Sequence, residues 1–272
     1  MKSVPLYENA EKKSYYKYMD IPLIEPAPEE IEWARTFRGD PTQALRFEDR
    51  ASLQELDHTI APEGVYYIND GTIFMCAVTE TPNITGEMFE WWFLWHHLDQ
   101  LRFAIWDPED HYDVKIPEES RKRILNQDIS IRERIYGVSC TCLESFNGEQ
   151  PQSLSFTFCD PGEVGFKREL IGTDGCMAIF CSNANVKKGP IDIPVFLAYV
   201  LKKGPDGKNV VVMHYWMGKN VKDGEDVTRS LWFRGFLVEL PSMLIVHTHK
   251  EMKRLNQILP QLYEENKDNW DE

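Results

Sequence analysis

The chain of 272 residues is 42% hydrophobic and carries a formal net charge of −14. A chain of this size and composition buries a substantial core in one large domain or two small ones. So acidic a protein has no basic surface to neutralise phosphate groups, and we expect no nucleic-acid partner. The N-terminal stretch lacks an apolar run of signal-peptide length, and no segment approaches the roughly 18 apolar residues of a membrane helix. We therefore expect a cytoplasmic protein without a membrane partner.

Residues 1–60 are rich in tyrosine, proline and charged residues and contain no long hydrophobic run. Short helices are predicted at 28–37, where Pro28 suits the first helical turn, and near 49–56. The scattered aromatic and aliphatic side chains allow this segment to pack on something larger. We predict an N-terminal extension, residues 1–60, that wraps over a catalytic domain formed by residues 61–272.

Strand patterns begin at residue 65. Runs rich in β-branched and aromatic residues at 65–68 and 72–78 flank a hairpin-type turn that contains Gly71. A helix is predicted at 86–100 with Thr85 as its N-cap, followed by a strand-like run at 101–106. Further strands are predicted at 132–146, 153–159, 176–182, 194–201 and 209–217, with a tight Gly-Pro-Asp-Gly turn between the last two.

The chain closes with a long helix predicted after Pro241, a residue that suits a first helical turn. Many antiparallel strands followed by one half-apolar C-terminal helix favour the α+β class. We expect a curved antiparallel sheet around the C-terminal helix.

The six cysteines show no C-x-x-C pair, and most of them lie within apolar, strand-like runs. A reduced thiol in such a run packs as a small hydrophobic side chain. We therefore expect reduced core residues at Cys76, Cys140, Cys142, Cys159, Cys176 and Cys181.

Three polar side chains are predicted to point into the core. In the C-terminal helix, His247 and Glu251 share the apolar stripe and are four residues apart, which places them over the same turn. In the strand 132–146, Glu144 alternates in phase with the apolar residues. A buried carboxylate is costly unless it is protonated, paired or bound to a metal ion. Two carboxylates and one imidazole in one core favour a divalent cation.

A fourth metal ligand is expected from one of the remaining histidines, and the residue patterns leave the choice open. His111 follows a Pro-containing turn, a rigid loop of the kind that aims a ligand. The other candidates, each of which could equally be a packed or surface histidine, are His58, His96, His97 and His214.

Two further features indicate a pocket. His214 and Tyr215 are neighbours on a strand, so one of them points to the inner face of the sheet and is a candidate proton donor. The segment around Trp91 and Trp95 is dense in aromatic residues. Core packing explains most of that density, but a flat pocket for a planar ring would use the same side chains.

The segments WWFLWHH, LRFAIWDPEDH, CLES and HTHKE, in this order over about 160 residues, resemble the diacetylphloroglucinol and phloretin hydrolases. The resemblance implies a zinc-dependent enzyme that cleaves the carbon–carbon bond between an acyl group and a phenolic ring. It also implies a START-like helix-grip fold, a homodimer and one zinc ion per chain. The family's two histidines and two glutamates, the last pair in H-x-x-x-E, would correspond to His111, Glu144, His247 and Glu251.

This chain departs from the family pattern at two positions. Phe103 replaces the tyrosine of R-Y-x-I-W, and Val114 stands where an amide side chain is expected. Both changes remove hydrogen-bonding groups, so a site built from Phe103 and Val114 favours a different hydroxylation pattern on the substrate. We predict that these two residues, with Trp91 and Trp95, contact an acyl-phenol substrate.

The reaction implied by the resemblance is a retro-Claisen hydrolysis. Four protein ligands exceed the usual three of catalytic zinc, so Glu144 or Glu251 is expected to bind loosely and to accept a proton. His214 or Tyr215 would donate a proton to the ring. The alternatives are a non-haem iron oxygenase acting on aromatics and a non-catalytic protein that holds hydrophobic ligands.

Overall fold

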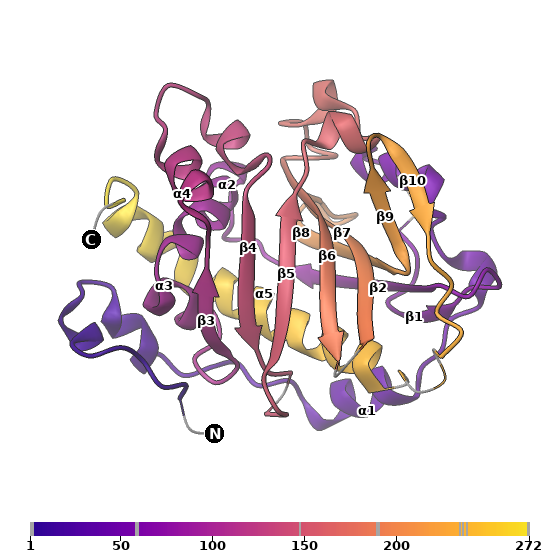
Figure 1. The fold of residues 1–272 in the computed structure, drawn as a ribbon, viewed down its shortest axis with the longest axis horizontal. Helices are drawn as coiled ribbons and strands as arrows, with labels where there is room; N and C mark the ends of the chain where they lie inside the picture. The colour runs from indigo at the N-terminus through magenta and orange to yellow at the C-terminus, as the bar shows by residue number, and fades with distance from the viewer. Residues whose placement is uncertain are drawn as a thin grey trace.

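The computed structural model describes residues 3–57, 60–146, 148–188, 191–233, 235, 237 and 239–270. Within these ranges, eight strands form one antiparallel sheet in the order β1-β2-β8-β7-β6-β5-β4-β3, and β9 pairs with β10 in a separate hairpin (Figure 1). The strands are β1 (Gly64–Tyr67), β2 (Ile73–Glu80), β3 (His111–Lys115), β4 (Ser139–Glu144), β5 (Gln152–Phe158), β6 (Ala178–Lys188), β7 (Ile191–Lys203), β8 (Asn209–Met217), β9 (Lys219–Lys222) and β10 (Glu225–Thr228).

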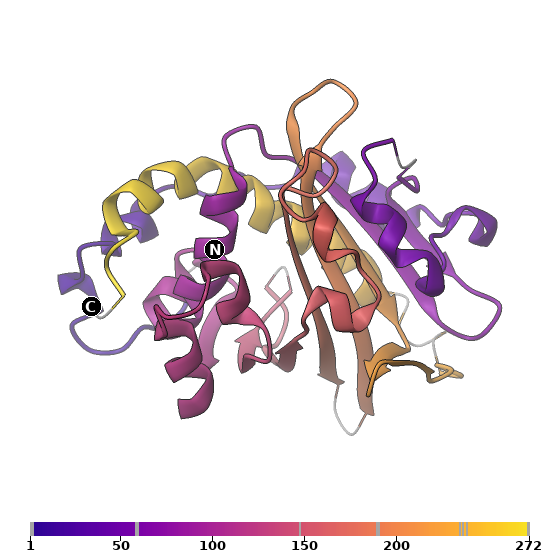
Figure 2. The ribbon, with the colours of Figure 1, turned by 90° about the horizontal axis from the view of Figure 1, so that it is seen from above.

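Most of the α-helices pack on one side of this sheet. The α-helices are α1 (Pro28–Thr36), α2 (Gly86–Trp95), α3 (Gln100–Ala104), α4 (Glu118–Leu125) and α5 (Glu239–Asn266). Side chains of α2, α3 and α5 share one core cluster with the sheet, and Figures 1 and 2 show α5 crossing its face. The predicted α+β class and curved antiparallel sheet around a long C-terminal helix are confirmed. None of the helices that the structure describes is long and apolar enough to cross a membrane.

Strand β8 shows how the sheet is covered on both faces. Every residue from Asn209 to Met217 is buried. Because side chains alternate along a strand, Met213 and Tyr215 face the cluster under α5, whereas Val212 and Trp216 face a second cluster on the opposite side. Such a nearly continuous apolar run is typical of a strand covered on two sides.

The N-terminal segment supplies much of the cover on that second side. The 3-10 helix η4 (Phe47–Gln54) places the Phe47 ring 5.1 Å from the Phe196 ring and 5.5 Å from the Trp216 ring. The segment thus packs into cores that it shares with the sheet. The division into an extension, residues 1–60, and a domain, residues 61–272, stays a prediction.

Local structure follows several of the expected signals. Thr85 caps α2 by accepting a hydrogen bond from the Met88 amide. Gly71 adopts a φ of 91°, and this left-handed conformation suits the turn between β1 and β2. Pro241 lies in the first turn of α5, although that helix begins slightly earlier than predicted, at Glu239.

Two predicted strands are wrong in part. Residues 101–106 do not form a strand, because Asp99 caps the short helix α3 with its side chain. The predicted strand 132–146 begins only at Ser139. Before it, Ile131–Ile135 form a 3-10 helix, and Gly137 turns the chain at a φ of 79°. The helix predicted near 49–56 is the 3-10 helix η4.

Arg254 ties α5 to the N-terminal segment and offers a test of this arrangement. Its fully buried guanidinium donates to the carbonyl oxygens of Tyr18, Ile21 and Ile105. Arg254→Met would leave these acceptors without a donor, and we expect the free energy of unfolding in urea to fall by about 2–4 kcal/mol. Arg46→Met is the control, because that side chain is 70% exposed. Equal effects of the two changes would contradict the role given to Arg254.

Candidate active site

The site begins at the paired ends of two strands. His111 opens β3 and Glu144 ends β4, and the antiparallel register sets the two residues opposite each other. Nδ1 of His111 donates to the carbonyl oxygen of Phe103 at 3.2 Å, so Nε2 is the ring nitrogen directed into the site. The Phe103 and His111 rings stack with centroids 4.2 Å apart, which fixes the plane of the imidazole.

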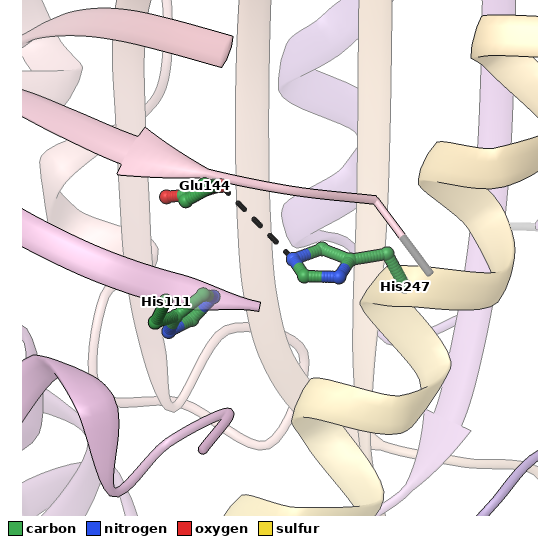
Figure 3. Close-up of side chains that lie close together, drawn as sticks. All are labelled: His111, Glu144 and His247. Atoms are coloured by element: carbon green, nitrogen blue, oxygen red, sulfur yellow. Dashed lines mark ion pairs between the residues drawn. The ribbon is translucent and has the colours of Figure 1, made fainter. Parts of the chain in front are cut away.

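Helix α5 brings two more side chains to the same point. Because His247 and Glu251 are one turn apart, both project toward His111 and Glu144. Oε1 of Glu251 lies 3.1 Å from Nε2 of His111 and 3.6 Å from Nε2 of His247. Oε2 of Glu144 lies 4.0 Å from Nε2 of His247, and Figure 3 shows the inward directions of three of these side chains. The sequence thus correctly predicted an inward His247, Glu251 and Glu144.

Burial governs the electrostatics of this cluster. Burial raises the pKa of Glu144 to about 8, although His111 opposes the shift. Burial also lowers the pKa of His247 to about 4. In His111, burial lowers the pKa, but contact with Glu251 and the charge of Glu144 outweigh it and raise the pKa to about 9. Without a cation, the pKa values of His111 and His247 therefore shift in opposite directions, and that of Glu144 rises.

The donor atoms fit a divalent cation. Nε2 of His111 approaches Glu251 without the alignment of a hydrogen bond, and among the described residues neither ring nitrogen of His247 has a hydrogen-bond partner. Buried polar atoms without partners are rare in native proteins. Ligand atoms of His111, Glu144 and His247 lie within 4.8 Å of one another. Two imidazoles with two carboxylates form a nitrogen and oxygen ligand set that suits zinc or iron.

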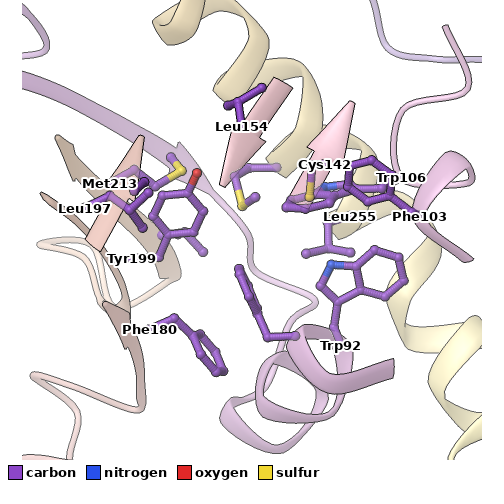
Figure 4. Close-up of a cluster of buried hydrophobic side chains, with 14 of the residues drawn as sticks. Trp92, Phe103, Trp106, Cys142, Leu154, Phe180, Leu197, Tyr199, Met213 and Leu255 are labelled. Atoms are coloured by element: carbon purple, nitrogen blue, oxygen red, sulfur yellow. The ribbon is translucent and has the colours of Figure 1, made fainter. Parts of the chain in front are cut away.

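A largely apolar cavity opens beside these four residues. It encloses about 750 Å³ of space not filled by protein atoms, part of it at the mouth. Glu144, His247 and Glu251 form one part of its wall. The apolar wall, part of which is seen in Figure 4, is formed by Phe93, Phe103, Trp106, Cys142, Phe146, Leu154, Phe156, Phe158, Ala184, Val186, Val195, Leu197 and Leu244. Such a cavity suits a small aromatic molecule with few polar groups.

A chain of hydroxyl groups forms another polar part of the wall. The hydroxyl of Tyr215 shares hydrogen bonds of 2.6 Å with Tyr199 and 2.7 Å with Thr248. All three side chains line the cavity. Burial raises the pKa values of both tyrosines well above the ordinary value, so the phenols stay protonated at neutral pH. Sequence patterns did not indicate Tyr199, in the apolar strand β7, or Thr248, in helix α5.

The structure distinguishes between the two candidate proton donors. Tyr215 faces the cavity, whereas His214 faces the opposite side of the sheet. There the His214 ring lies 5.0 Å from the Phe74 ring and 5.5 Å from the Trp216 ring, and its Nε2 lies 3.2 Å from Cys76 Sγ. A substrate in the cavity therefore meets Tyr215 and not His214.

The remaining candidate histidines and predicted substrate contacts also differ in whether they line the cavity. His96 and His97 line the cavity, but Nδ1 of each bonds a backbone carbonyl of the preceding turn at 2.6 Å. His58 lies outside the described residues. Phe103 lines the cavity. In the described part of the chain, three predicted contacts are buried without lining it: Trp91, Trp95 and Val114. The two tryptophans stack on each other, 4.8 Å apart, within the core.

A buried ionic cluster lies directly behind His247. Lys250 Nζ lies 2.9 Å from Asp107 Oδ2 and 2.8 Å from Asp110 Oδ2. At 3.6 residues per turn, Lys250 falls away from the apolar stripe that contains His247 and Glu251, yet the residue is only 2% exposed. The reason is that the loop before β3 covers that face of α5 with two carboxylates.

Comparisons with known proteins identify the family of this chain. The family model described as DAPG hydrolase PhiG domain matches residues 45–264. Phloretin hydrolase from Eubacterium ramulus is 29% identical over 97% of this chain and 94% of its own length. A 2,4-diacetylphloroglucinol hydrolase from Pseudomonas protegens is 27% identical over 93% of this chain and 84% of its own length. The chain therefore belongs to the DAPG hydrolase family, and the resemblance and the hydrolase class predicted from the sequence are confirmed.

The likeness to solved structures is weaker. Protein Ms6760 from Mycobacterium smegmatis aligns over 73% of this chain and 97% of its own, with a TM-score of 0.38 and 10% identity. Ara h 8.0201 aligns over 66% of this chain and 98% of its own, with a TM-score of 0.32 and 8% identity. The fold described above rests on the arrangement of the strands and α5 themselves.

The position of His214 leads to a testable difference. His214→Leu removes a buried imidazole from the far side of the sheet, and we expect it to lower the free energy of unfolding by about 1–3 kcal/mol. The amount of divalent metal bound per folded chain, measured by mass spectrometry, should not change. A folded His214→Leu protein that loses metal would contradict the placement of His214 outside the site.

Proposed function

We propose that this protein is a zinc-dependent hydrolase that cleaves the carbon–carbon bond between an acyl group and a phenolic ring. Membership of the DAPG hydrolase family supports the class of reaction. The observation that carries the proposal is the meeting of His111 with Glu144, His247 and Glu251, the last three of which line an apolar cavity. That arrangement offers ligands for a cation on one side of the cavity and room for an aromatic ring on the other.

The metal ion would be held by the same four side chains. Bound zinc supplies Lewis-acid activation of an acyl oxygen and of a water molecule. The hydrogen bond from Nδ1 of His111 to Phe103 directs Nε2 toward the ion. His247 and Glu251 are held by the packing of α5, and His111 and Glu144 belong to β3 and β4, so all four ligands sit on regular secondary structure elements.

The reaction follows from the chemistry of an acyl phenol. A hydroxyl group ortho to the acyl group lets the ring tautomerise to a ketone, so the bond to be broken resembles that of a β-diketone. Water adds to the acyl carbon, and the bonding electrons pass to the ring carbon. The products are a carboxylic acid and the deacylated phenol, and the ring carbon must receive one proton.

The protein's own groups can handle the protons of this reaction. Glu144 lines the cavity, so as a loosely bound carboxylate beside the proposed cation it could accept a proton from water. Glu251 is the second candidate for this role. Tyr215 is the candidate donor to the ring carbon or to a phenolate, because its hydroxyl is already oriented by Tyr199 and Thr248.

The apolar wall favours an aromatic substrate with fewer hydrogen-bonding groups near Phe103 than the family pattern implies. Phe103 stacks on His111 and lines the cavity, so a tyrosine at this position would carry its hydroxyl group at the cavity wall. A site without that hydroxyl loses its preference for a substrate phenol at this point. The substrate is therefore a small acyl phenol.

The homodimer stays a prediction, and sedimentation of the purified protein tests it.

Removing a ligand should remove the metal. We expect His247→Ala and Glu251→Gln each to abolish hydrolysis and to reduce the metal content from about one divalent ion per chain to none. His249→Ala is the matched control on the same helix, because His249 faces away and contacts Glu63 at 3.1 Å and Thr79 at 2.9 Å. Metal analysis of the folded variants decides the matter. Full zinc content in either ligand variant would count against the assignment.

Phe103→Tyr tests the specificity. The added hydroxyl should raise kcat/KM for the more hydroxylated acyl phenols by about tenfold relative to the less hydroxylated ones, since one hydrogen bond is worth about 1.4 kcal/mol. Phe156→Tyr is the control, because Phe156 lines the cavity from β5 without contacting His111. An unchanged preference in Phe103→Tyr would show that this position does not contact the substrate.

The proposed reaction has a direct test. The metal-loaded protein is incubated with a panel of acylphloroglucinols and dihydrochalcones, and products are identified by mass. Matched amounts of acid and deacylated phenol are expected, without consumption of oxygen. Oxygen uptake equal to product would support an oxygenase instead, and binding without any product would support a ligand carrier.

A further inference from the structure

The ionic cluster behind His247 has the composition of a second metal site. Asp107 and Asp110 are fully buried, and ligand atoms of Asp107, Asp110 and His247 lie within 4.8 Å of one another. Nδ1 of His247 lies 3.8 Å from Asp107 Oδ2 and 3.9 Å from Asp110 Oδ2. In the described part of the chain this nitrogen has no hydrogen-bond partner. Two carboxylates and an imidazole are a common set of ligands for a divalent ion.

His247 therefore stands between two acidic pairs. Its Nε2 faces Glu251 at 3.6 Å and Glu144 at 4.0 Å, whereas its Nδ1 faces the two aspartates. A neutral imidazole in this position can bind an ion on one side only, and it bridges two ions once its ring N–H proton is lost to give an imidazolate. What distinguishes the two sides is the charge already present on each.

On the aspartate side, a cation is already in place. Both Oδ2 atoms converge on Lys250 Nζ, at 2.9 Å and 2.8 Å. The Oδ1 atoms are used within the loop: that of Asp107 accepts from the Glu109 amide, and that of Asp110 accepts from Ser145 and from the Gly148 amide. Lys250 is therefore the group that neutralises the pair, with Glu109 Oε2 more distant at 3.8 Å.

We propose that Lys250 occupies the place of a second metal ion, so that the chain binds one divalent ion instead of two. The proposal rests on the proposed metal site at His111, Glu144, His247 and Glu251. An ammonium group bridging Asp107 and Asp110 repels a nearby divalent ion and fills the space between the carboxylates. It also keeps His247 available to the first site through Nε2. Lys250 is a positioning residue, since its ammonium group pairs with Asp107 and Asp110 and does not line the cavity.

Lys250→Met is the direct test, because methionine keeps the length of the aliphatic chain and lacks only the ammonium group. Wild-type and variant proteins are stripped with chelator, loaded with zinc chloride and dialysed, and zinc per chain is measured by mass spectrometry. We expect two ions in the variant and one in the wild type. One ion in a folded Lys250→Met protein would overturn the proposal. A wild-type protein that binds none would instead overturn the proposed function.

Two further measurements keep the test decisive. If Lys250→Met does not fold without metal, zinc is expected to restore its fold, because binding to the folded state stabilises it; failure at saturating zinc would contradict the proposal. Asp107→Asn retains Lys250 and should retain one ion per chain. Loss of that ion would show that Asp107 is itself a ligand of the first site and would overturn the assignment of Lys250.

Discussion

The structure depends on the burial of two imidazoles and two carboxylates against one another in an apolar core. His111, Glu144, His247 and Glu251 are each at most 8% exposed. Each of them would be costly to bury alone, and together the carboxylates repel while the imidazoles compete for protons. A shared divalent cation satisfies all four at once. Without a cation, burial lowers the pKa of His247, whereas the neighbouring carboxylates raise the pKa of His111.

The fold brings these groups together from distant parts of the chain. The β3–β4 register sets His111 opposite Glu144, and α5 lies across the sheet so that one of its turns faces this pair. Arg254 anchors the same helix to the N-terminal segment, while Lys250 anchors it to the loop before β3. Because these anchors lie within one turn of Glu251 on either side, the position of α5 and the geometry of the site are fixed by the same contacts.

Periodicity predicted much of this arrangement. The alternation of β4 and the stripe of α5 correctly turned Glu144, His247 and Glu251 inward, because those patterns are set by local geometry. The choice of His111 among the histidines depended on strand register, which no local pattern contains. The same limitation explains why the burial of Lys250 was not predicted: a helical wheel places it away from the apolar stripe, but a loop covers that face of α5. It also explains why Trp91 was predicted to contact the substrate, although its ring packs in the core and does not line the cavity.

The ligand set of the bound metal is the central claim, and X-ray absorption at the zinc edge of the loaded protein measures it most directly. The account predicts a first shell of nitrogen and oxygen only, at about 2.0–2.2 Å, with the outer scattering of two imidazoles. Sulfur at about 2.3 Å would contradict it, because that distance would assign the ion to cysteines such as Cys140 and Cys142 instead.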